Sequence, residues 1–278
     1  MQDFKPFLKW AGGKSRIAHK IDDCIPSSTR RIIEPFVGGT SVSLRISANS
    51  YLLADTNSDL ISTYKYLVEN PARFIGDCQV LFDGSFNSSQ KYYELREEFN
   101  TSSDSYRRAC IFVYLNRHCF NGLIRFNANG HFNTPFGKYE LPKFPHKEMR
   151  LFAERFKVAE FLVSDFRMTM TKAGQGDFVY CDPPYTPIGK LGFTAYAKGG
   201  FLVKDHEDLV VCCQEAAKRG ACVVISNHDT PETRVLYTGA TELFTLNVKR
   251  TISCKGDARY AAAELIAVYD DGKISGVQ

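Results

Sequence analysis

One short stretch combines the residue types that chemistry on an amine needs. Asp182, Pro183, Pro184 and Tyr185 directly follow an apolar run at residues 178–181. The run predicts a buried strand. The strand must end there, because proline has no N–H to donate to a sheet. We therefore expect Asp182 at the carboxyl end of a strand, where open α/β sheets bind their ligands.

Methylation of an exocyclic amine on a nucleobase would use these four residues together. The lone pair of such an amine is delocalised into the ring, so the amine is a poor nucleophile. The carboxylate of Asp182 and the carbonyl of Pro183 can accept its two N–H bonds and steer the lone pair outward, while Tyr185 offers a stacking face for the base. The alternative is a simple strand-ending turn, which Asp-Pro often forms. The apolar strand before it favours the catalytic interpretation.

A second candidate lies near the amino terminus, where Gly12 and Gly13 precede Lys14. This segment is similar to the end of a phosphate-binding P-loop. That loop requires its first glycine where this chain has Leu8, so we exclude a nucleoside-triphosphate site. The glycine pair between Trp10 and Lys14 still allows a ligand to approach the backbone closely.

The next segment predicts the opening of a nucleotide-binding α/β unit. A strand at residues 31–36 leads into a turn at Gly38 and Gly39, followed by a helical pattern through Leu44. The full dinucleotide fingerprint is absent, which disfavours a dinucleotide enzyme. A second strand, residues 51–54, ends in Asp55, which is well placed to bind ribose hydroxyls. Its alternative role is to cap the following helix.

The alternation of strands and helices stops between residues 57 and 144 and then resumes. The interruption predicts helices at 59–70, 71–82, 90–99 and 105–117, and then a hairpin around Asn129-Gly130. After it we expect helices at 146–156 and 205–219 and strands at 160–163, 178–182, 222–226, 242–248 and 264–269. A glycine-rich loop at 186–201 could act as a lid. The pattern predicts a Rossmann-like α/β domain, residues 1–56 and 145–278, with a helical insertion, residues 57–144.

Composition and charge limit the compartment and the partner. The 278 residues include nine cysteines without Cys-x-x-Cys spacing, so we expect free thiols, no metal site and a reducing, cytoplasmic location. We expect neither a signal peptide nor a membrane span. The net charge is only +4, but no acid occurs between Ser105 and Tyr139. This basic segment predicts an anionic partner, although Arg107 and Arg108 alone are better interpreted as a solvated face.

Several motifs in order resemble one family, the DNA adenine-N6 methyltransferases of the Dam family. They are residues 7–14, 34–41, 53–55 and 182–185, with an insertion before the last, joined by 96–99, 114–117, 120–125, 133–138 and 226–230. The resemblance covers nearly the whole chain. It implies a class I methyltransferase with a seven-stranded mixed sheet, S-adenosylmethionine as methyl donor, and double-stranded DNA bound by the insertion.

The resemblance also assigns residues. It implies cofactor contacts at Trp10, Lys14, Phe36, Gly38, Asp55, Asp165 and Asp182. It implies contacts with bases, or with the gap left by a flipped base, at Lys9, Phe120, Asn121, Leu123, Arg125 and Pro135, and phosphate contacts at Arg96, Arg117, Asn127, Asn133 and Lys138. Two departures stand out: Phe120 replaces a tyrosine that the family often carries, and the loops after Tyr185 and near Cys254 differ.

The sequence therefore predicts a monomeric enzyme that methylates N6 of a flipped adenine in duplex DNA. Only the resemblance supplies the target GATC. Two alternatives remain: a catalytically inactive DNA-binding module of the same fold, and methylation of adenine in RNA or of another amine. The intact residues 182–185 argue against the first, and the basic insertion with its hairpin favours duplex DNA over the second.

Overall fold

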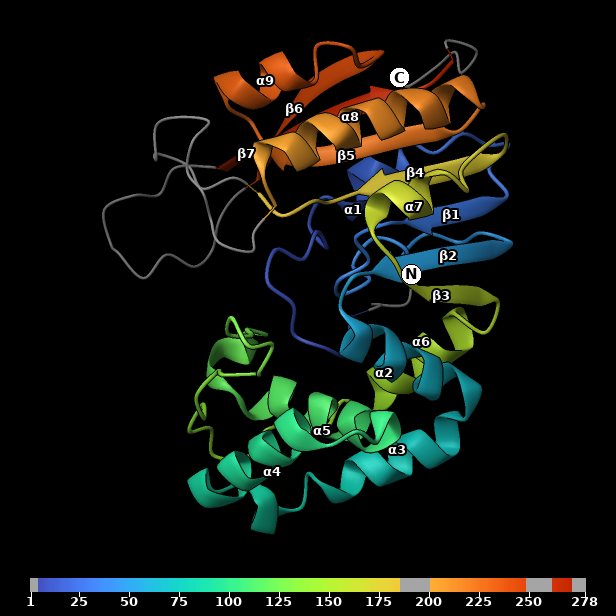
Figure 1. Cartoon of the computed structure of the whole chain (residues 1–278). Coiled ribbons are helices and arrows are strands. Elements are labelled where there is room, and N and C mark those ends of the chain that lie inside the picture. Colours follow the sequence, from blue (N-terminus) through green and yellow to red (C-terminus); the bar gives the residue numbers. More distant parts are fainter. Residues whose placement is uncertain (1–4, 186–200, 249–261, 272–278) are drawn as a thin grey trace. The chain divides into compact units, whose positions relative to one another are not determined.

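A computed structural model describes residues 5–185, 201–248 and 262–271. Within these residues seven strands form one mixed sheet in the order β3-β2-β1-β4-β5-β7-β6 (Figure 1). The neighbours β2, β1, β4 and β5 are parallel, whereas β7 is antiparallel to both β5 and β6. The strands are β1 (Arg31–Glu34), β2 (Ser50–Asp55), β3 (Ala159–Val163), β4 (Asp177–Cys181), β5 (Cys222–His228), β6 (Glu242–Val248) and β7 (Ala262–Tyr269). The predicted mixed sheet is confirmed.

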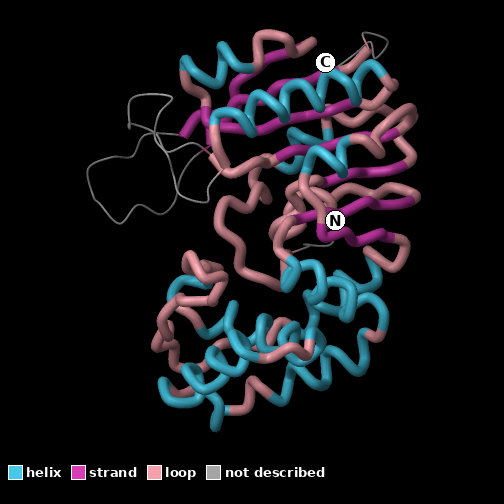
Figure 2. Tube along the Cα trace, viewed as in Figure 1, coloured by secondary structure: helices cyan, strands magenta, loops and turns pink. Residues whose placement is uncertain are grey.

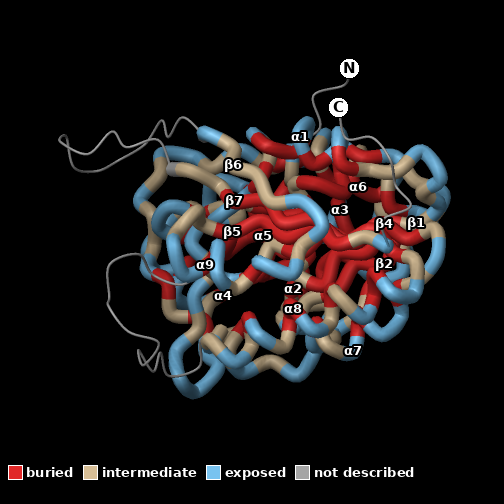
Figure 3. The backbone as a smooth tube through the Cα atoms, turned by 90° about the horizontal axis from the view of Figure 1, so that it is seen from above, coloured by how far each residue is buried: buried red, intermediate tan, exposed pale blue. Residues whose placement is uncertain are grey.

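The central strand β4 is the most fully enclosed, because its apolar side chains face protein on both sides. Each of its residues is buried, and Figure 3 shows the central strands in red. The strand order reverses between β1 and β4, since β2 and β3 follow on one side and β5 on the other. The carboxyl ends of strands beside such a switch point form the usual ligand-binding crevice. Asp182 directly follows β4.

The helices fall into two groups. Four belong with the sheet: α1 (Ala18–Asp22), α7 (Phe166–Met170), α8 (Val203–Lys218) and α9 (Pro231–Leu236). Helix α8 packs against β5, as Figure 1 shows. The others are α2 (Ser58–Glu69), α3 (Pro71–Val80), α4 (Ser89–Thr101), α5 (Ser105–His118) and α6 (His146–Arg155), with 3-10 turns η1 (Gly84–Phe86) and η2 (Phe120–Gly122). Residues 57–144 are all described and contain no regular strand (Figure 2).

The predicted hairpin around Asn129-Gly130 forms without regular strands. Its arms meet at the isolated antiparallel bridge of Phe126 with Phe132. Asn127 N–H donates to the carbonyl of His131 at 2.9 Å, and Asn133 N–H donates to that of Arg125 at 3.0 Å. The side chain of Asn100 in α4 takes the place of a ladder partner, since it accepts from the N–H of Phe132 at 2.8 Å and donates to its carbonyl at 3.2 Å. The hairpin is thus tied to a helix.

The helix predicted to run from the glycine turn through Leu44 is not formed. Residues 41–45 form turns, and residue 46 is a bend. Positive φ angles at Gly38 (40°) and Thr40 (58°) reverse the chain, and left-handed backbone does not continue into a helix. The segment keeps two helix-like bonds, from Leu44 N–H to the carbonyl of Thr40 at 3.1 Å and from Ile46 N–H to that of Val42 at 3.3 Å.

The chain divides into two compact units. The first comprises residues 1–13, 38–47 and 55–163, and the second comprises 14–37, 48–54 and 164–278. The helical insertion lies inside the first unit, and its boundaries as a separate domain stay a prediction. The predicted lid and the basic loop near Cys254 lie outside the described residues, except for Phe201. No helix in the described part is long and apolar enough to cross a membrane.

Candidate active site and nucleic-acid interface

The carboxylate of Asp182 is held by two side chains of the second unit. Lys14 Nζ lies 3.0 Å from Oδ1, and the hydroxyl of Ser226 in β5 donates to the same oxygen at 3.3 Å. Burial raises the pKa of Asp182, while the positive charge of Lys14 opposes the rise. Both contacts fall on Oδ1, so these two residues leave Oδ2 to a ligand. The Asp182 side chain keeps 22% of its surface exposed, enough for a ligand to reach it.

The ring of Tyr185 is fixed from several sides. Its hydroxyl donates to Glu264 Oε2 at 2.7 Å. Lys14 Nζ lies 4.4 Å from the ring centroid, and His228 packs edge-on at 4.5 Å. Burial raises the pKa of the phenol, which stays protonated and able to donate. Between Asp182 and this ring, Pro183 is buried and Pro184 is exposed.

A second cluster in this unit is aromatic. Phe36 follows β1, and its ring stacks on that of Phe166 with the centroids 5.3 Å apart. The ring of Phe201 packs edge-on against Phe36, with the centroids 5.6 Å apart. Asp165 caps α7 by accepting the N–H of Arg167 at 2.9 Å and forms an ion pair with its guanidinium at 3.2 Å. The predicted cofactor contacts Phe36 and Asp165 therefore flank Phe166, and Asp165 has a structural role as well.

Trp10, Gly38 and Asp55 form a tight group in the first unit. A Cβ at Gly38 would lie 2.7 Å from Trp10 Nε1, so only glycine fits this turn. Asp55 accepts from the N–H of Gly38 at 3.1 Å and from that of Asn57 at 2.9 Å. Burial raises the pKa of Asp55. The capping role suggested for Asp55 belongs to Asn57, which is the N-cap of α2. Asp55 instead braces the glycine turn.

Lys9 is clamped to the insertion through its backbone and its side chain. Asn116 in α5 accepts from the N–H of Lys9 at 2.8 Å and donates to its carbonyl at 2.7 Å. Gly122 (φ 65°) lies so close that a Cβ there would stand 2.4 Å from Lys9 Cδ. The ammonium lies 4.6 Å above the ring of Tyr139, whose hydroxyl accepts the N–H of Asn121 at 2.9 Å. The predicted base contacts Lys9 and Asn121 are thus joined through Tyr139.

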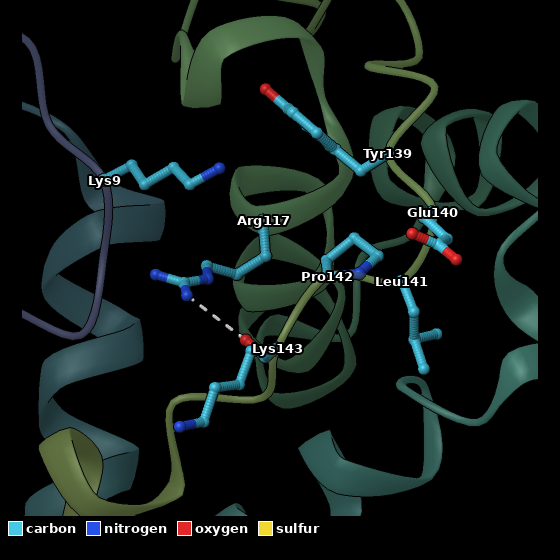
Figure 4. Close-up of a pocket in the computed structure, with 7 residues that line it drawn as sticks. All are labelled: Lys9, Arg117, Tyr139, Glu140, Leu141, Pro142 and Lys143. Carbon is cyan, nitrogen blue, oxygen red and sulfur yellow. Dashed lines mark hydrogen bonds between the residues drawn. The ribbon is translucent and has the colours of Figure 1, made fainter.

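Lys9 and Arg117 reach into one cavity of about 330 Å³ (Figure 4). The guanidinium of Arg117 donates to the carbonyls of Phe7 and Lys143, at 3.4 and 3.2 Å. Its buried Nε has no hydrogen-bond partner among the described residues. Burial lowers the pKa of Lys9 and of Arg117. Two partly desolvated cations in one cavity attract an anion. Its other lining residues are Tyr139, Glu140, Leu141, Pro142 and Lys143.

The tip of the insertion presents apolar and basic groups. Phe120 and Leu123 are 52% and 39% exposed. Arg125 is oriented by Asn133, whose side-chain oxygen accepts at 2.7 Å and whose carbonyl accepts at 3.3 Å. The side chain of Asn127 closes the hairpin turn by accepting the N–H groups of residues 129 and 131, each at 3.0 Å.

The remaining predicted DNA contacts lie in the same unit. Arg96 in α4 lies 4.6 Å from the ring of Tyr93 and donates to the carbonyl of Thr134 at 3.3 Å. Pro135 accepts the N–H of Phe120 at 2.9 Å, and Lys138 has a positive φ of 54°. By contrast, Arg107 and Arg108 are half-buried and ion-paired with Glu98 and Asp59, each at 2.7 Å, rather than forming a solvated face.

Four residues around these sites had no role in the sequence-based assignment: Asn116, Tyr139, Ser226 and Glu264. Their partners are distant in the chain: Lys9 and Asn116 are 107 positions apart, and Tyr185 and Glu264 are 79 positions apart. Ser226 carried a signal as a polar residue at the predicted end of a strand, and both Ser226 and Asn116 lie in segments that carry the family resemblance. Glu264 lies in an ordinary strand and carried none.

Fold and site together define a class. The sheet is doubly wound, and Asp-Pro-Pro-Tyr follows the strand at its switch point, which is the arrangement expected of an enzyme that methylates amines. A family model described as D12 class N6 adenine-specific DNA methyltransferase matches residues 10–252. The DNA adenine methylase of Serratia marcescens is 45% identical over 271 residues, 97% of this chain and 100% of that protein. The DNA adenine methylase of Escherichia coli (strain K12) is 41% identical over 276 residues, 99% of each chain.

The chain belongs to the D12 class N6 adenine-specific DNA methyltransferase family. It is an adenine-specific DNA methyltransferase, as the resemblance in the sequence predicted.

Proposed function

We propose that this enzyme transfers a methyl group from S-adenosylmethionine to N6 of an adenine that is flipped out of duplex DNA within GATC. We also propose that it acts as a monomer in the cytoplasm. The cluster around Asp182 carries the chemical part of the proposal. Flipping follows because the target atom of a base is out of reach inside a duplex. The choice of GATC rests on the family resemblance at Lys9 and at the tip, residues 120–125.

In the proposed complex, Oδ2 of Asp182 and the carbonyl of Pro183 each accept one N–H of the adenine amine. The amine nitrogen is then pinned in the plane defined by these acceptors, with its lone pair directed away from them. The ring of Tyr185 stacks on the flipped base. The amine itself attacks, so no covalent intermediate with the protein is needed. Most of the rate acceleration then comes from position and electrostatics.

The predicted cofactor residues have a chemistry that fits S-adenosylmethionine. Asp55 is a half-buried acceptor for ribose hydroxyls, and Lys14 is a cation suited to the cofactor's carboxylate. Phe36 offers an aromatic face near Asp165, an acceptor for an adenine amine. The Trp10 indole fills the space that a Cβ at Gly38 would need, so a ligand at this turn would meet the indole. When bound, the cofactor supplies an electrophilic methyl group on a sulfonium sulfur.

Substitution of Asp182 tests the chemistry. Asp182→Asn keeps the shape but replaces one acceptor by a donor, and Asp182→Ala removes both oxygens. We expect each to slow methyl transfer from radiolabelled S-adenosylmethionine to a GATC duplex by two or more orders of magnitude, as for loss of a transition-state hydrogen bond of roughly 3 kcal/mol. DNA affinity should change far less. Asp23→Asn, at an exposed site, is the control. Near-normal turnover of both Asp182 variants would overturn the proposal.

Substrate choice needs its own experiment. Sequencing of methylated positions in plasmid DNA from cells that express the chain should return adenine in GATC. RNA of the same sequence should stay unmethylated, and methylated RNA would favour the RNA alternative. A chain that binds the duplex but cannot be crosslinked to S-adenosylmethionine by ultraviolet light would be an inactive DNA-binding module.

A further inference from the structure

We propose that Glu264 is a positioning residue, which fixes the ring of Tyr185 through the tyrosine hydroxyl and so sets the surface on which the target adenine stacks. This inference rests on the proposed function, in which a flipped base meets that ring. Glu264 lies in β7, far from residues 182–185 in the sequence.

The geometry of two neighbouring strands supports this role. Glu264 in β7 is the direct cross-strand partner of His228 in β5, and Figure 1 shows β5 and β7 side by side. Side chains of such partners project from the same face of a sheet. Both contact Tyr185: His228 packs edge-on against the ring at 4.5 Å, and Glu264 accepts from the hydroxyl at 2.7 Å. A rigid pair of strand residues thus supports both the side and the tip of the ring.

The hydrogen bond to Glu264 is the contact that fixes the ring most firmly. A bond to a carboxylate is stronger and more directional than ring packing. The hydroxyl also lies 3.4 Å from Ser226 Oγ, which is engaged elsewhere, with Tyr180 at 2.8 Å and Asp182 at 3.3 Å, and it contacts the Asp182 carboxylate as well. Rotation of the ring about its Cα–Cβ bond would carry the hydroxyl away from Glu264. The carboxylate therefore opposes that rotation.

A second carboxylate near Asp182 has an electrostatic cost. The negative charge of Glu264 raises the pKa of Asp182 and so works against the ionised form that accepts the amine. The positive charge of Lys14 offsets this effect. A residue that disfavours the reactive state of its neighbour needs a compensating benefit, and a fixed stacking ring supplies one.

A double-mutant cycle tests the inference. Glu264→Ala removes the acceptor, Tyr185→Phe removes the hydroxyl, and the double variant removes both. With cofactor and DNA saturating, we expect each single variant to slow single-turnover methylation about tenfold. The double variant should be no slower than the slower single, because both changes remove one interaction. Glu264→Gln, which keeps an acceptor oxygen, should recover to within about threefold of the wild type.

Two further readouts separate positioning from a merely structural effect. In a duplex with 2-aminopurine at the target adenine, Glu264→Ala and Tyr185→Phe should alter the fluorescence of the flipped base while affinity for S-adenosylmethionine is unchanged. The titratable groups that face Asp182 in the described residues are Lys14, Glu264, Tyr180 and Tyr185. Glu264→Gln should therefore move the acid limb of the pH–rate profile to lower pH. Glu242→Ala, at an exposed site on β6, is the matched control.

The outcomes are distinct. Three results would each overturn the role of Glu264: a wild-type rate in Tyr185→Phe, additive losses of rate in the double variant, or a Glu264→Ala variant that behaves like Glu242→Ala. Because these results come from different variants, the inference stays testable even where one variant folds poorly. If the wild type itself neither flips 2-aminopurine nor methylates the duplex, the proposed function fails instead.

Discussion

At the residue scale, the reactivity of Asp182 depends on opposing neighbours. Burial and the charge of Glu264 raise the pKa of its carboxyl, and Lys14 lowers it. Only the ionised form of Asp182 can both accept an amine hydrogen and pair with the ammonium of Lys14. Activity should therefore be lost as the pH falls through a pKa that lies above the ordinary aspartate value of about 3.9.

Lys14→Met tests this balance. The variant removes the positive charge that lies 3.0 Å from Asp182, so the pKa of Asp182 should rise further. The acid limb of the kcat profile should move to higher pH. The measurement is kcat at saturating cofactor, because Lys14 is also a proposed cofactor contact. A limb that stays in place would show that Lys14 does not control the ionisation of Asp182.

The glycine turn gives a second residue-scale prediction. Asp55→Ala removes the acceptor that braces Gly38, and Gly38→Ala forces a Cβ to 2.7 Å from Trp10 Nε1. Both should weaken S-adenosylmethionine binding by about tenfold or more in calorimetry, while DNA binding without cofactor stays largely intact. Asp83→Ala, at an exposed site in the same unit, is the control. If the cofactor affinity of Asp55→Ala is unchanged, Asp55 only braces the glycine turn and does not bind the cofactor.

At the element scale, the tip of the insertion depends on contacts that cross between segments. The hairpin arms lack a regular ladder and are held by Asn100 of α4. Arg125 is in turn oriented by Asn133 of the opposite arm. A guanidinium held in one orientation can form two hydrogen bonds with a guanine edge, worth about 1–3 kcal/mol of discrimination.

Arg125→Ala distinguishes base reading from phosphate contact. If Arg125 reads a base, as we expect, methylation of one-base variants of GATC should rise relative to GATC itself. If it contacts phosphate, activity should fall about equally on all sites and the salt dependence should become shallower. Asn133→Ala should reproduce the loss of discrimination more weakly, since the guanidinium remains but loses its orientation.

The elements of the sheet were largely predictable, whereas the contacts between them were not. The strand before Asp182 follows from its apolar run and the prolines after it, and β4 ends one residue before that aspartate. The prediction of a helix after Gly39 was wrong, because the spacing of apolar residues does not reveal the left-handed backbone at Gly38 and Thr40. The contacts of Tyr139 with Lys9 and of Glu264 with the Tyr185 hydroxyl were missed, because local patterns carry no information about partners many residues away. The roles assigned to the cofactor and DNA contacts stay predictions.

At the scale of the whole molecule, each unit contains a histidine buried in its neutral form. Burial lowers the pKa of His118 and of His206 to about 4. The unfolded chain takes up these protons near pH 6.5, before the folded protein does. The contribution of these histidines to the free energy of unfolding is therefore complete above about pH 6.5. It falls as the pH drops toward 4, by up to roughly 3 kcal/mol for each histidine.

Urea unfolding between pH 7.5 and 4.5 checks this expectation. The midpoint should fall across that range, and His118→Phe should flatten part of the fall, because a phenyl ring can pack against Tyr114 and Phe82 but takes up no proton. His19→Asn, at an exposed site, should follow the wild type. Identical slopes for the wild type and His118→Phe would show that His118 does not contribute to acid sensitivity.

The contact of Trp10 with the two glycines has a spectroscopic consequence. Trp10 is the only tryptophan of the chain, and its indole lies against the turn of Gly38 and Gly39. All indole emission of the native protein therefore originates at this one place. A ligand that covers the turn should shift or quench that emission without any added dye, so the titration of an unlabelled protein yields its affinity directly.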